Sequence, residues 1–161
     1  MKTAIIYATK HGTTENVASN IADKLSSAHE VELISLRKIS KPTLSDFEIV
    51  ILGTPIYAGK ASKKMKSFCK AYETILLKKK IGLYVCGMHP SREKQETELK
   101  EAYPEHLLNN ASAIGFMGGE FLFEKMNLFE RLIIKKIAKT NISVHWINFK
   151  EIDNFVSAIL E

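Results

Sequence analysis

The fold of this chain is decided by the stretch Ile5-Ile6-Tyr7-Ala8-Thr9-Lys10-His11-Gly12-Thr13-Thr14. The stretch begins as an apolar run of strand length and ends in hydroxyl and glycine residues. Apolar residues then recur with helical spacing at Val17, Ala18, Ile21, Ala22 and Leu25. A buried strand that turns directly into a helix leaves the first N–H groups of the helix unpaired, and the helix dipole adds partial positive charge there. The stretch therefore predicts an anion site between a strand and a helix.

The hydroxyl groups of Thr9, Thr13 and Thr14 indicate that this anion is a phosphate, because they add donors to the backbone amides of the same loop. A helix cap is the alternative, but a single threonine satisfies that role. The patterns of nucleoside-triphosphatase loops, G-x-x-x-x-G-K-[ST], and of dinucleotide sites, G-x-G-x-x-G, are both absent. We therefore interpret residues 9–14 as a phosphate-binding loop of another kind.

Length and composition indicate one soluble globular domain over residues 1–161. No apolar run approaches the roughly 20 residues that span a bilayer. The N-terminal residues lead straight into a strand and lack the layout of a signal peptide, so we expect a cytoplasmic protein. The two cysteines, Cys69 and Cys86, are too few for a disulfide framework and fit a reducing compartment.

The net charge of +5, from 23 basic and 18 acidic residues, favours anionic partners such as phosphates, lipid headgroups or carboxylated substrates. Nucleic acid is a further class of anion. The sequence, however, has neither basic residues interleaved with aromatic ones nor the spacing of zinc fingers or helix-turn-helix motifs. We therefore expect no nucleic-acid binding. His11 and His89 lack the i, i+4 pairing of a metal site, so we expect no metal either.

Apolar segments of strand length alternate with helical patterns along the chain. We predict strands at about 2–8, 31–36, 49–52, 81–86 and 111–117. We predict helices at about 13–27, around Met65–Tyr72, at 91–102 with Ser91 as cap, up to 108, and after the capping pair Asn148 and Glu151. The alternating strand 31–36 is expected near a sheet edge. Together these elements predict an α/β fold with a doubly wound parallel sheet and helices on both faces.

Three turn-rich loops follow predicted strands, at residues 9–14, 54–60 and 86–91. The carboxyl ends of parallel strands share one edge of the sheet, and ligands bind at that edge, so the three loops are expected to surround one site. We expect the binding residues to be Thr9, Lys10, His11, Gly12, Thr13, Thr14, Thr54, Pro55, Ile56, Tyr57, Ala58, Gly59, Lys60, Cys86, Gly87, Met88 and His89.

Tyr57 and His89 are the two side chains of these loops for which a specific role can be considered. Tyr57 lies in a loop without apolar periodicity, and its ring offers a flat face on which another ring can stack. The alternative is that Tyr57 packs on the helix that begins near Lys60. His89 is either an exposed loop histidine or a proton relay beside the bound ligand. The sequence does not assign a catalytic acid or base.

The first loop resembles the signature of the flavodoxin family. The signature has an apolar pair, an aromatic, a Thr or Ser, a small residue, a Thr, an Ala and an aliphatic at fixed spacing. The matching residues here are Ile5-Ile6, Tyr7, Thr9, Gly12, Thr14, Ala18 and Ile21. The resemblance implies a flavodoxin-like sheet of five parallel strands in the order 2-1-3-4-5. It also implies FMN as cofactor, with residues 9–14 around its 5′-phosphate and the other two loops around the isoalloxazine.

The same resemblance implies roles for residues in the second and third loops. The Ala58–Gly59 peptide would turn its carbonyl toward N5 of the reduced flavin, and glycine permits the required backbone angles at low cost. Lys60 would alternatively lie near N1 and C2=O, where a cation raises the flavin potential. Family members often carry a second aromatic in the third loop, whereas this chain has Met88 and His89. One face of the flavin is therefore expected to be more open to a substrate.

A basic amphipathic insertion is predicted at about residues 119–141. Between residues 121 and 139, five cationic side chains and two carboxylates give a net charge of +3, which is over half that of the chain. The apolar residues on one helical face are Leu122, Met126, Phe129, Ile133 and Ile137. Either this face packs on the core and the basic face is solvated, or the helix binds an anionic membrane or a partner.

The insertion, and an aromatic residue before a final helix that contains Asn154-Phe155, make the layout similar to the flavodoxin-like, quinone-dependent protoporphyrinogen oxidases. This resemblance implies an FMN-dependent oxidoreductase of heme biosynthesis that passes hydrogen from an anionic porphyrinogen to a quinone. It also implies a peripheral position at the inner face of the cell membrane, with contact through residues 121–139. The alternatives are a flavodoxin-type electron carrier with a redox partner protein, a small NAD(P)H or quinone reductase, and a cofactor-free binding module.

Overall fold

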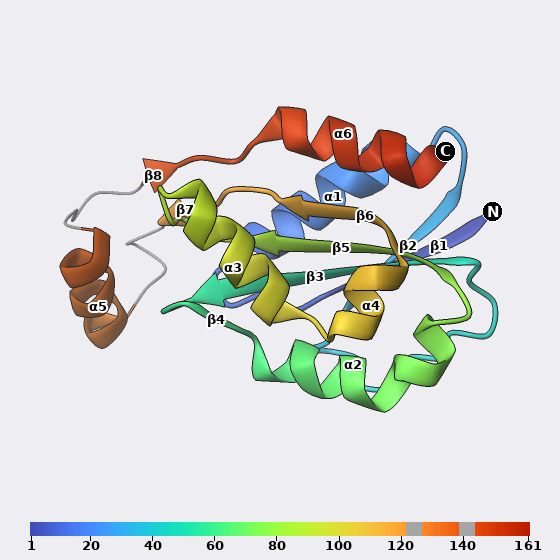
Figure 1. The fold of residues 1–161 in the computed structure, drawn as a ribbon, viewed down its shortest axis with the longest axis horizontal. Coiled ribbons are helices and arrows are strands. Elements are labelled where there is room, and N and C mark those ends of the chain that lie inside the picture. The colour runs from blue at the N-terminus through green and yellow to red at the C-terminus, as the bar shows by residue number, and fades with distance from the viewer. Residues whose placement is uncertain (122–126, 139–143) are drawn as a thin grey trace.

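A parallel sheet forms the middle layer of the computed structural model, which describes residues 1–121, 127–138 and 144–161 (Figure 1). The strands of this sheet are β1 (Lys2–Tyr7), β2 (Glu30–Ser35), β3 (Ile49–Tyr57), β5 (Lys80–Cys86) and β6 (Ala111–Phe116). Their order is β2-β1-β3-β5-β6, and neighbouring strands are parallel. This is the predicted order 2-1-3-4-5 once the parallel strands alone are numbered, so the predicted α/β, flavodoxin-like sheet is confirmed.

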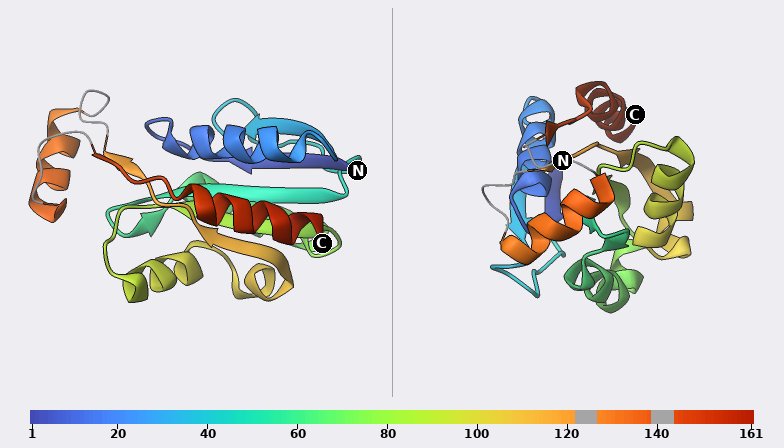
Figure 2. Two further views of the ribbon diagram at one scale, coloured as in Figure 1. Left: turned by 90° about the horizontal axis from the view of Figure 1, so that it is seen from above. Right: turned by 90° about the vertical axis from the view of Figure 1, so that its left-hand side faces the viewer.

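Helices cover both faces of the sheet, as Figure 2 shows. On one face lie α1 (Thr13–Leu25) and α6 (Phe149–Leu160), and on the other lie α2 (Lys63–Leu76), α3 (Arg92–Ala102) and α4 (Glu105–Asn110). Each face has its own apolar core. Ile5 belongs to the core under α1 and α6, whereas its neighbour Ile6 belongs to the core under α2 and α4. Adjacent side chains of a strand point to opposite faces, which is why an inner strand buried on both sides is a continuous apolar run.

The ends of the helices test the predicted caps. Asn148 precedes α6, and its Oδ1 accepts a hydrogen bond from the Glu151 N–H at 3.0 Å, so this predicted cap is confirmed. Ser91 is the N-cap residue of α3, as predicted, but its side chain makes no capping hydrogen bond. The edge position predicted for the second strand is confirmed, since β2 is an outer strand in which Ile34 alone is buried.

Strand β3 is longer than the sequence predicts, and the predicted loop at 54–60 is correspondingly shorter. Thr54 and Pro55 pair with β5, and Tyr57 pairs with Lys60 of the short antiparallel strand β4 (Lys60–Ala61). Only Ala58 and Gly59 remain as a turn, with φ angles of 49° and 73°. Two successive positive φ angles are those of a two-residue type I′ hairpin turn. Residues 54–57 therefore lie on a strand end that ladder hydrogen bonds hold in place.

The segment between β6 and α6 extends beyond the carboxyl edge of the sheet (Figure 1). It contains α5 (Leu128–Ala138) and the two-stranded antiparallel sheet of β7 (Glu120–Phe121) and β8 (Val144–His145). Parts of the predicted insertion lie outside the described residues, namely Leu122, Glu124, Lys125, Met126, Lys139 and the side chains of Ile133 and Ile137. Phe129 is exposed, so the alternative in which the apolar face of the insertion packs on the core is wrong for this residue. Within the described ranges, no helix is long and apolar enough to cross a membrane.

Candidate functional site

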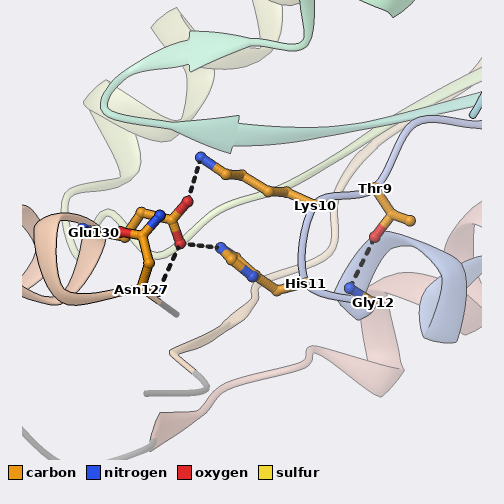
Figure 3. A network of polar contacts seen from close by, with 6 residues as sticks. All are labelled: Thr9, Lys10, His11, Gly12, Asn127 and Glu130. Carbon is orange, nitrogen blue, oxygen red and sulfur yellow. Dashed lines mark hydrogen bonds and ion pairs between the residues drawn. The ribbon is translucent and has the colours of Figure 1, made fainter. Parts of the chain in front are cut away.

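The phosphate loop, residues 9–14, connects β1 to α1. Gly12 is the N-cap of α1 with a left-handed φ of 95°, and Thr9 Oγ1 accepts a hydrogen bond from the Gly12 N–H at 3.0 Å (Figure 3). No side chain makes a capping hydrogen bond to α1. The alternative in which a threonine caps the helix is therefore wrong. The first N–H groups of α1 are left to an external acceptor, which is the arrangement of an anion site.

Thr14, in the first turn of α1, has a fully buried side chain, and its Oγ1 has no hydrogen-bond partner of ordinary geometry. The neighbouring Cys86 thiol is its one polar contact among the described residues, and a thiol is a weak hydrogen-bonding group; burial raises the pKa of Cys86 to about 12, against the lowering effect of Thr14. A buried hydroxyl without a partner costs about 1–3 kcal/mol, so such groups are rare. An anion held by the first amides of α1 would accept the Thr14 hydrogen. This orphaned hydroxyl therefore fits a phosphoester group.

Tyr84 of β5 holds the start of α1 in place through a hydrogen bond. Its hydroxyl donates to the Thr14 carbonyl oxygen at 3.0 Å, and burial raises the pKa of Tyr84 well above its ordinary value, so it remains a donor. The ring occupies the space beside Gly53, where a Cβ would lie 2.0 Å from Cζ of Tyr84. No sequence pattern indicates this contact, because Tyr84 is one residue of an apolar strand. It was therefore missed as a residue that supports the site.

The ring of Tyr57 lies beside the phosphate loop. Lys10 Nζ is 4.1 Å from the ring centroid, within cation–π range, and the ring centroids of His11 and Tyr57 are 6.5 Å apart. Burial raises the pKa of Tyr57, with Lys10 opposing the shift, and its buried hydroxyl has no hydrogen-bond partner among the described atoms. The ring contacts that the structure describes are with the loop rather than with α2. The second and first predicted binding segments thus meet at Tyr57, as the sheet topology predicts.

The other residues of the second segment divide between support and exposure. Thr54 is buried, and its Oγ1 accepts a hydrogen bond from the Ser62 N–H at 3.1 Å, which fastens the hairpin to the start of α2. Ile56 packs against the core of the α2 face. Ala58 and Lys60 are exposed at the turn, and Ala58 adopts a positive φ that non-glycine residues rarely take. Their contacts with a flavin stay predictions.

The third segment, residues 86–89, is fastened to the turn that follows β6. The Gly87 N–H donates to the Gly118 carbonyl at 2.9 Å. His89 Nδ1 accepts from the Ser91 N–H at 3.1 Å, which assigns the proton of the neutral imidazole to Nε2. Beside this segment is a pocket of about 360 Å³, whose lining includes Met88, His89, Phe116, Trp146 and Asn148. Phe116 and Trp146 were not among the predicted site residues, and they add aromatic surface to this end of the site.

Glu130 of α5 reaches the phosphate loop (Figure 3). Its Oε1 lies 2.8 Å from Lys10 Nζ and its Oε2 lies 3.1 Å from His11 Nε2. Glu130 is only 8% exposed. Burial opposes its ionisation, but the hydrogen bond and charge of Lys10, with His11 and the Asn127 N–H, lower the pKa of Glu130 below its ordinary value. The group is therefore a carboxylate at neutral pH, held between two side chains of the loop.

Two carboxylates of the insertion, Glu130 and Glu120, were missed as site residues. Asn127 and Glu130 have the spacing of a capping box, and Asn127 Oδ1 accepts from the Glu130 N–H at 2.8 Å. This spacing is a signal for the start of α5, but nothing in the sequence links Glu130 to Lys10. Glu120 accepts a hydrogen bond from Thr13 Oγ1 at 3.4 Å, and its Oε1 lies 3.4 Å from His145 Nδ1. The insertion thus contacts the phosphate loop at two points.

Comparison with protein families gives a match to the flavodoxin domain over residues 4–145. Protoporphyrinogen IX dehydrogenase [quinone] of Escherichia coli K12 is 22% identical over 171 residues, which cover 99% of this chain and 94% of the relative. The flavodoxin of Clostridium saccharobutylicum is 36% identical over 84 residues, about half of each chain (51% and 52%).

Solved structures of flavodoxins have the same fold. A short-chain flavodoxin associated with a non-canonical PDU bacterial microcompartment superposes with a TM-score of 0.62 at 15% identity, covering 99% of this chain and 97% of that one. Oxidised flavodoxin 2 of Bacillus cereus gives a TM-score of 0.58 at 19% identity and covers 99% and 98%. Both likenesses concern the fold, to which the three predicted binding segments and the insertion are attached.

Proposed function

The chain belongs to the flavodoxin family, whose cofactor FMN it shares, and on that premise we propose that it is an oxidoreductase of the quinone-linked protoporphyrinogen dehydrogenase type. The coarser part of this function, an FMN flavoprotein that transfers electrons, follows from the family. The observation that carries the finer part is the insertion. It sets a basic helix with exposed apolar side chains against the phosphate loop through Glu130. The full-length match to the E. coli dehydrogenase supports the same assignment.

In the proposed holoenzyme, the phosphate of FMN is held by the first amides of α1 and by the hydroxyl of Thr14. Tyr57 would provide ring surface for the isoalloxazine, and residues 86–89 would border it from the neighbouring strand. FMN supplies the hydrogen and electron transfer, and the protein binds, orients and shields it. His89 lines the pocket together with Met88 and Trp146, and the Nε2–H of its neutral imidazole can donate a hydrogen bond to a bound substrate.

The proposed partners follow from charge and exposure. A porphyrinogen carries carboxylates, and a protein with a net charge of +5 attracts such anions. A quinone in a membrane would be reached by a protein that binds the bilayer surface through residues 121–139. Within the described part of that segment, the exposed cations Lys135 and Lys136 suit an anionic headgroup layer. The proposed location is therefore cytoplasmic and peripheral at the inner face of the cell membrane.

The test has two stages on the purified full-length protein. Fluorescence titration with FMN is expected to give saturable quenching, and a protein without affinity for FMN would leave only the cofactor-free binding module. The FMN-loaded protein is then mixed without oxygen with protoporphyrinogen IX, with and without menadione as the quinone. The proposal expects porphyrin to form only when the quinone is present. No porphyrin in either mixture would reject it.

A flavodoxin-type electron carrier is the second candidate, and the match of half the chain to a clostridial flavodoxin favours it. A carrier would leave protoporphyrinogen unchanged and would pass electrons from a reductase to a second protein such as cytochrome c. A small NAD(P)H or quinone reductase would instead consume NADH or NADPH when menadione is added. The three activities are read by different absorbance changes, so one set of assays separates them.

A further inference from the structure

The apolar side chains of α5 that the structure describes are exposed, which is the opposite of what a helix packed on a domain shows. Leu128 is 75% exposed, Phe129 72% and Leu132 58%, whereas the charged residue Glu130 is 8% exposed. A surface helix of a globular protein normally buries its apolar stripe and exposes its charges. The carboxylate of α5 is therefore the group that attaches the described part of this helix to the phosphate loop.

The geometry of a helix separates the two faces. Residues two positions apart are rotated by about 200°, so Leu128 and Leu132 both lie on the side of α5 opposite to Glu130. Arg131, Lys135 and Lys136 are also exposed. The outward face thus combines apolar side chains with cations, which is the composition of helices that lie in the headgroup layer of an anionic membrane. Charge and exposure together favour a lipid surface as the occupant of this face.

The inward contact involves the side chains of the phosphate loop and leaves its backbone amides to the anion. Figure 3 shows Lys10 and His11 extending from the loop toward α5, while the Thr9 hydroxyl turns back to the Gly12 N–H. Lys10 contacts Glu130 at 2.8 Å and also lies 4.1 Å from the Tyr57 centroid. A phosphoester on the amides and Glu130 on the side chains therefore use different groups of the same loop. Each order the loop, so each is expected to favour the other.

We propose that Glu130 is a positioning residue that ties α5 to the phosphate loop and couples the binding of FMN to the binding of an anionic lipid surface. The inference rests on the proposed function for its cofactor and for its membrane. With α5 attached through Glu130, the face that carries Leu128 and Leu132 is turned toward lipid, and the loop is held in the form that binds phosphate. Coupling between two sites is reciprocal, so lipid tightens FMN binding by the factor by which FMN tightens lipid binding.

The first experiment compares Glu130→Gln with Glu93→Gln, which makes the same charge change at an exposed position of α3. FMN affinity is measured by flavin fluorescence with and without vesicles of phosphatidylcholine and phosphatidylglycerol in a 3:1 ratio. For the wild type and for E93Q, vesicles are expected to tighten FMN binding by about fivefold or more, the lower end of typical coupling. For E130Q the vesicle effect is expected to vanish. Equal vesicle effects in E130Q and E93Q, or no vesicle effect in the wild type, would overturn the coupling.

A second measurement separates positioning from general stability. Amide hydrogen exchange is followed for residues 127–138 in the wild type, in Lys10→Glu, in Glu130→Lys and in the double variant with both changes. Each single change brings like charges together and is expected to speed exchange in α5, while the double variant restores the ion pair in reverse and is expected to restore protection. Absence of this rescue would mean that Glu130 does not act through Lys10.

The outcomes of these experiments and of the enzyme assays are distinguishable. FMN binding and vesicle effects are measured on unreacted protein, so the coupling can hold for a protein that leaves protoporphyrinogen unchanged. Conversely, the protein could form porphyrin while vesicles leave its FMN affinity unchanged. That result would support the proposed function and reject only the coupling.

Discussion

The phosphate loop and helix α5 meet at Glu130, but different interactions hold each of them in place. The loop rests on buried structure: β1 and α1 belong to the apolar core, the Tyr84 hydroxyl binds the Thr14 carbonyl, and Thr9 closes the turn on Gly12. In the described part of α5, Glu130 is buried while the large apolar side chains are exposed. The binding loop is therefore part of the packed domain, whereas the described side chains of α5 contact the loop through a few polar groups, so we expect α5 to open at a lower free energy than the loop.

A change in the buried packing that supports the phosphate loop is expected to have the largest effect on the free energy of unfolding. Gly53→Ala places a Cβ 2.0 Å from Cζ of Tyr84, so the ring must move and its hydrogen bond to Thr14 is lost. Overpacking of a buried site costs about 1–3 kcal/mol or more, and the lost hydrogen bond adds about 1 kcal/mol. We expect urea denaturation to show a free energy of unfolding lower by about 3 kcal/mol or more.

Gly59→Ala is the matched control for this change. A Cβ at Gly59 meets no atom within 4 Å, and only the φ of 73° is unfavourable for alanine. The expected loss is about 1 kcal/mol. If the two alanine variants were equally stable, the loop would not depend on the packing of Tyr84 in the way proposed here.

Removing the orphaned hydroxyl is expected to separate stability from binding. In Thr14→Val the shape is kept and an unpaired buried polar group disappears, so the free energy of unfolding should stay constant or rise by up to about 1 kcal/mol. A hydrogen bond to a charged phosphate is worth about 1.5–3 kcal/mol, which corresponds to an increase of about 10- to 150-fold in the Kd for FMN. Riboflavin, which lacks the phosphate, should bind both proteins equally. Equal FMN affinities would place the phosphate away from Thr14.

The same comparison explains how far the sequence could predict the molecule. The strands of the sheet and the phosphate loop depend on short-range patterns, such as the apolar run 49–52 and the change from Tyr7 to Thr9, and they were predicted. The order of the strands was predicted from the family resemblance and is confirmed. The extension of β3 to Tyr57 depends on pairing with β4 and β5, which no local pattern encodes. The contact of Glu130 with Lys10 joins residues that are distant in the chain, so it leaves no periodicity and was missed.

Lowering the pH is expected to release α5 while the loop stays folded. Burial opposes ionisation of Glu130, but Lys10 and His11 hold its pKa below the ordinary value of 4.5. Since the folded pKa is the lower one, the stabilisation from Glu130 is complete above pH 4.5 and is lost as the pH falls through the lowered value. Hydrogen exchange of residues 127–138, corrected for intrinsic rates, should therefore accelerate relative to exchange in β1 only below pH 4.5.

Glu130→Gln provides the control for this titration, because it cannot gain a proton in the same range. Its α5 exchange should be fast at every pH and should show no further acceleration below pH 4.5. An acceleration of the same size in E130Q would assign the transition to another carboxylate of the domain.

The smallest effect is expected for Phe129→Ala, which tests the outward face of α5. Phe129 is 72% exposed, whereas Phe155 of α6 is 3% exposed in the core. Phe155→Ala should cost about 3–5 kcal/mol of unfolding free energy, while Phe129→Ala should change it by less than about 0.5 kcal/mol. Sedimentation with the 3:1 vesicles should nevertheless decrease for Phe129→Ala, because the ring that would enter the headgroup layer is gone. A loss of stability near that of Phe155→Ala would mean that the ring packs on the domain in solution. Unchanged stability with unchanged sedimentation would instead mean that the exposed ring has no role in lipid binding.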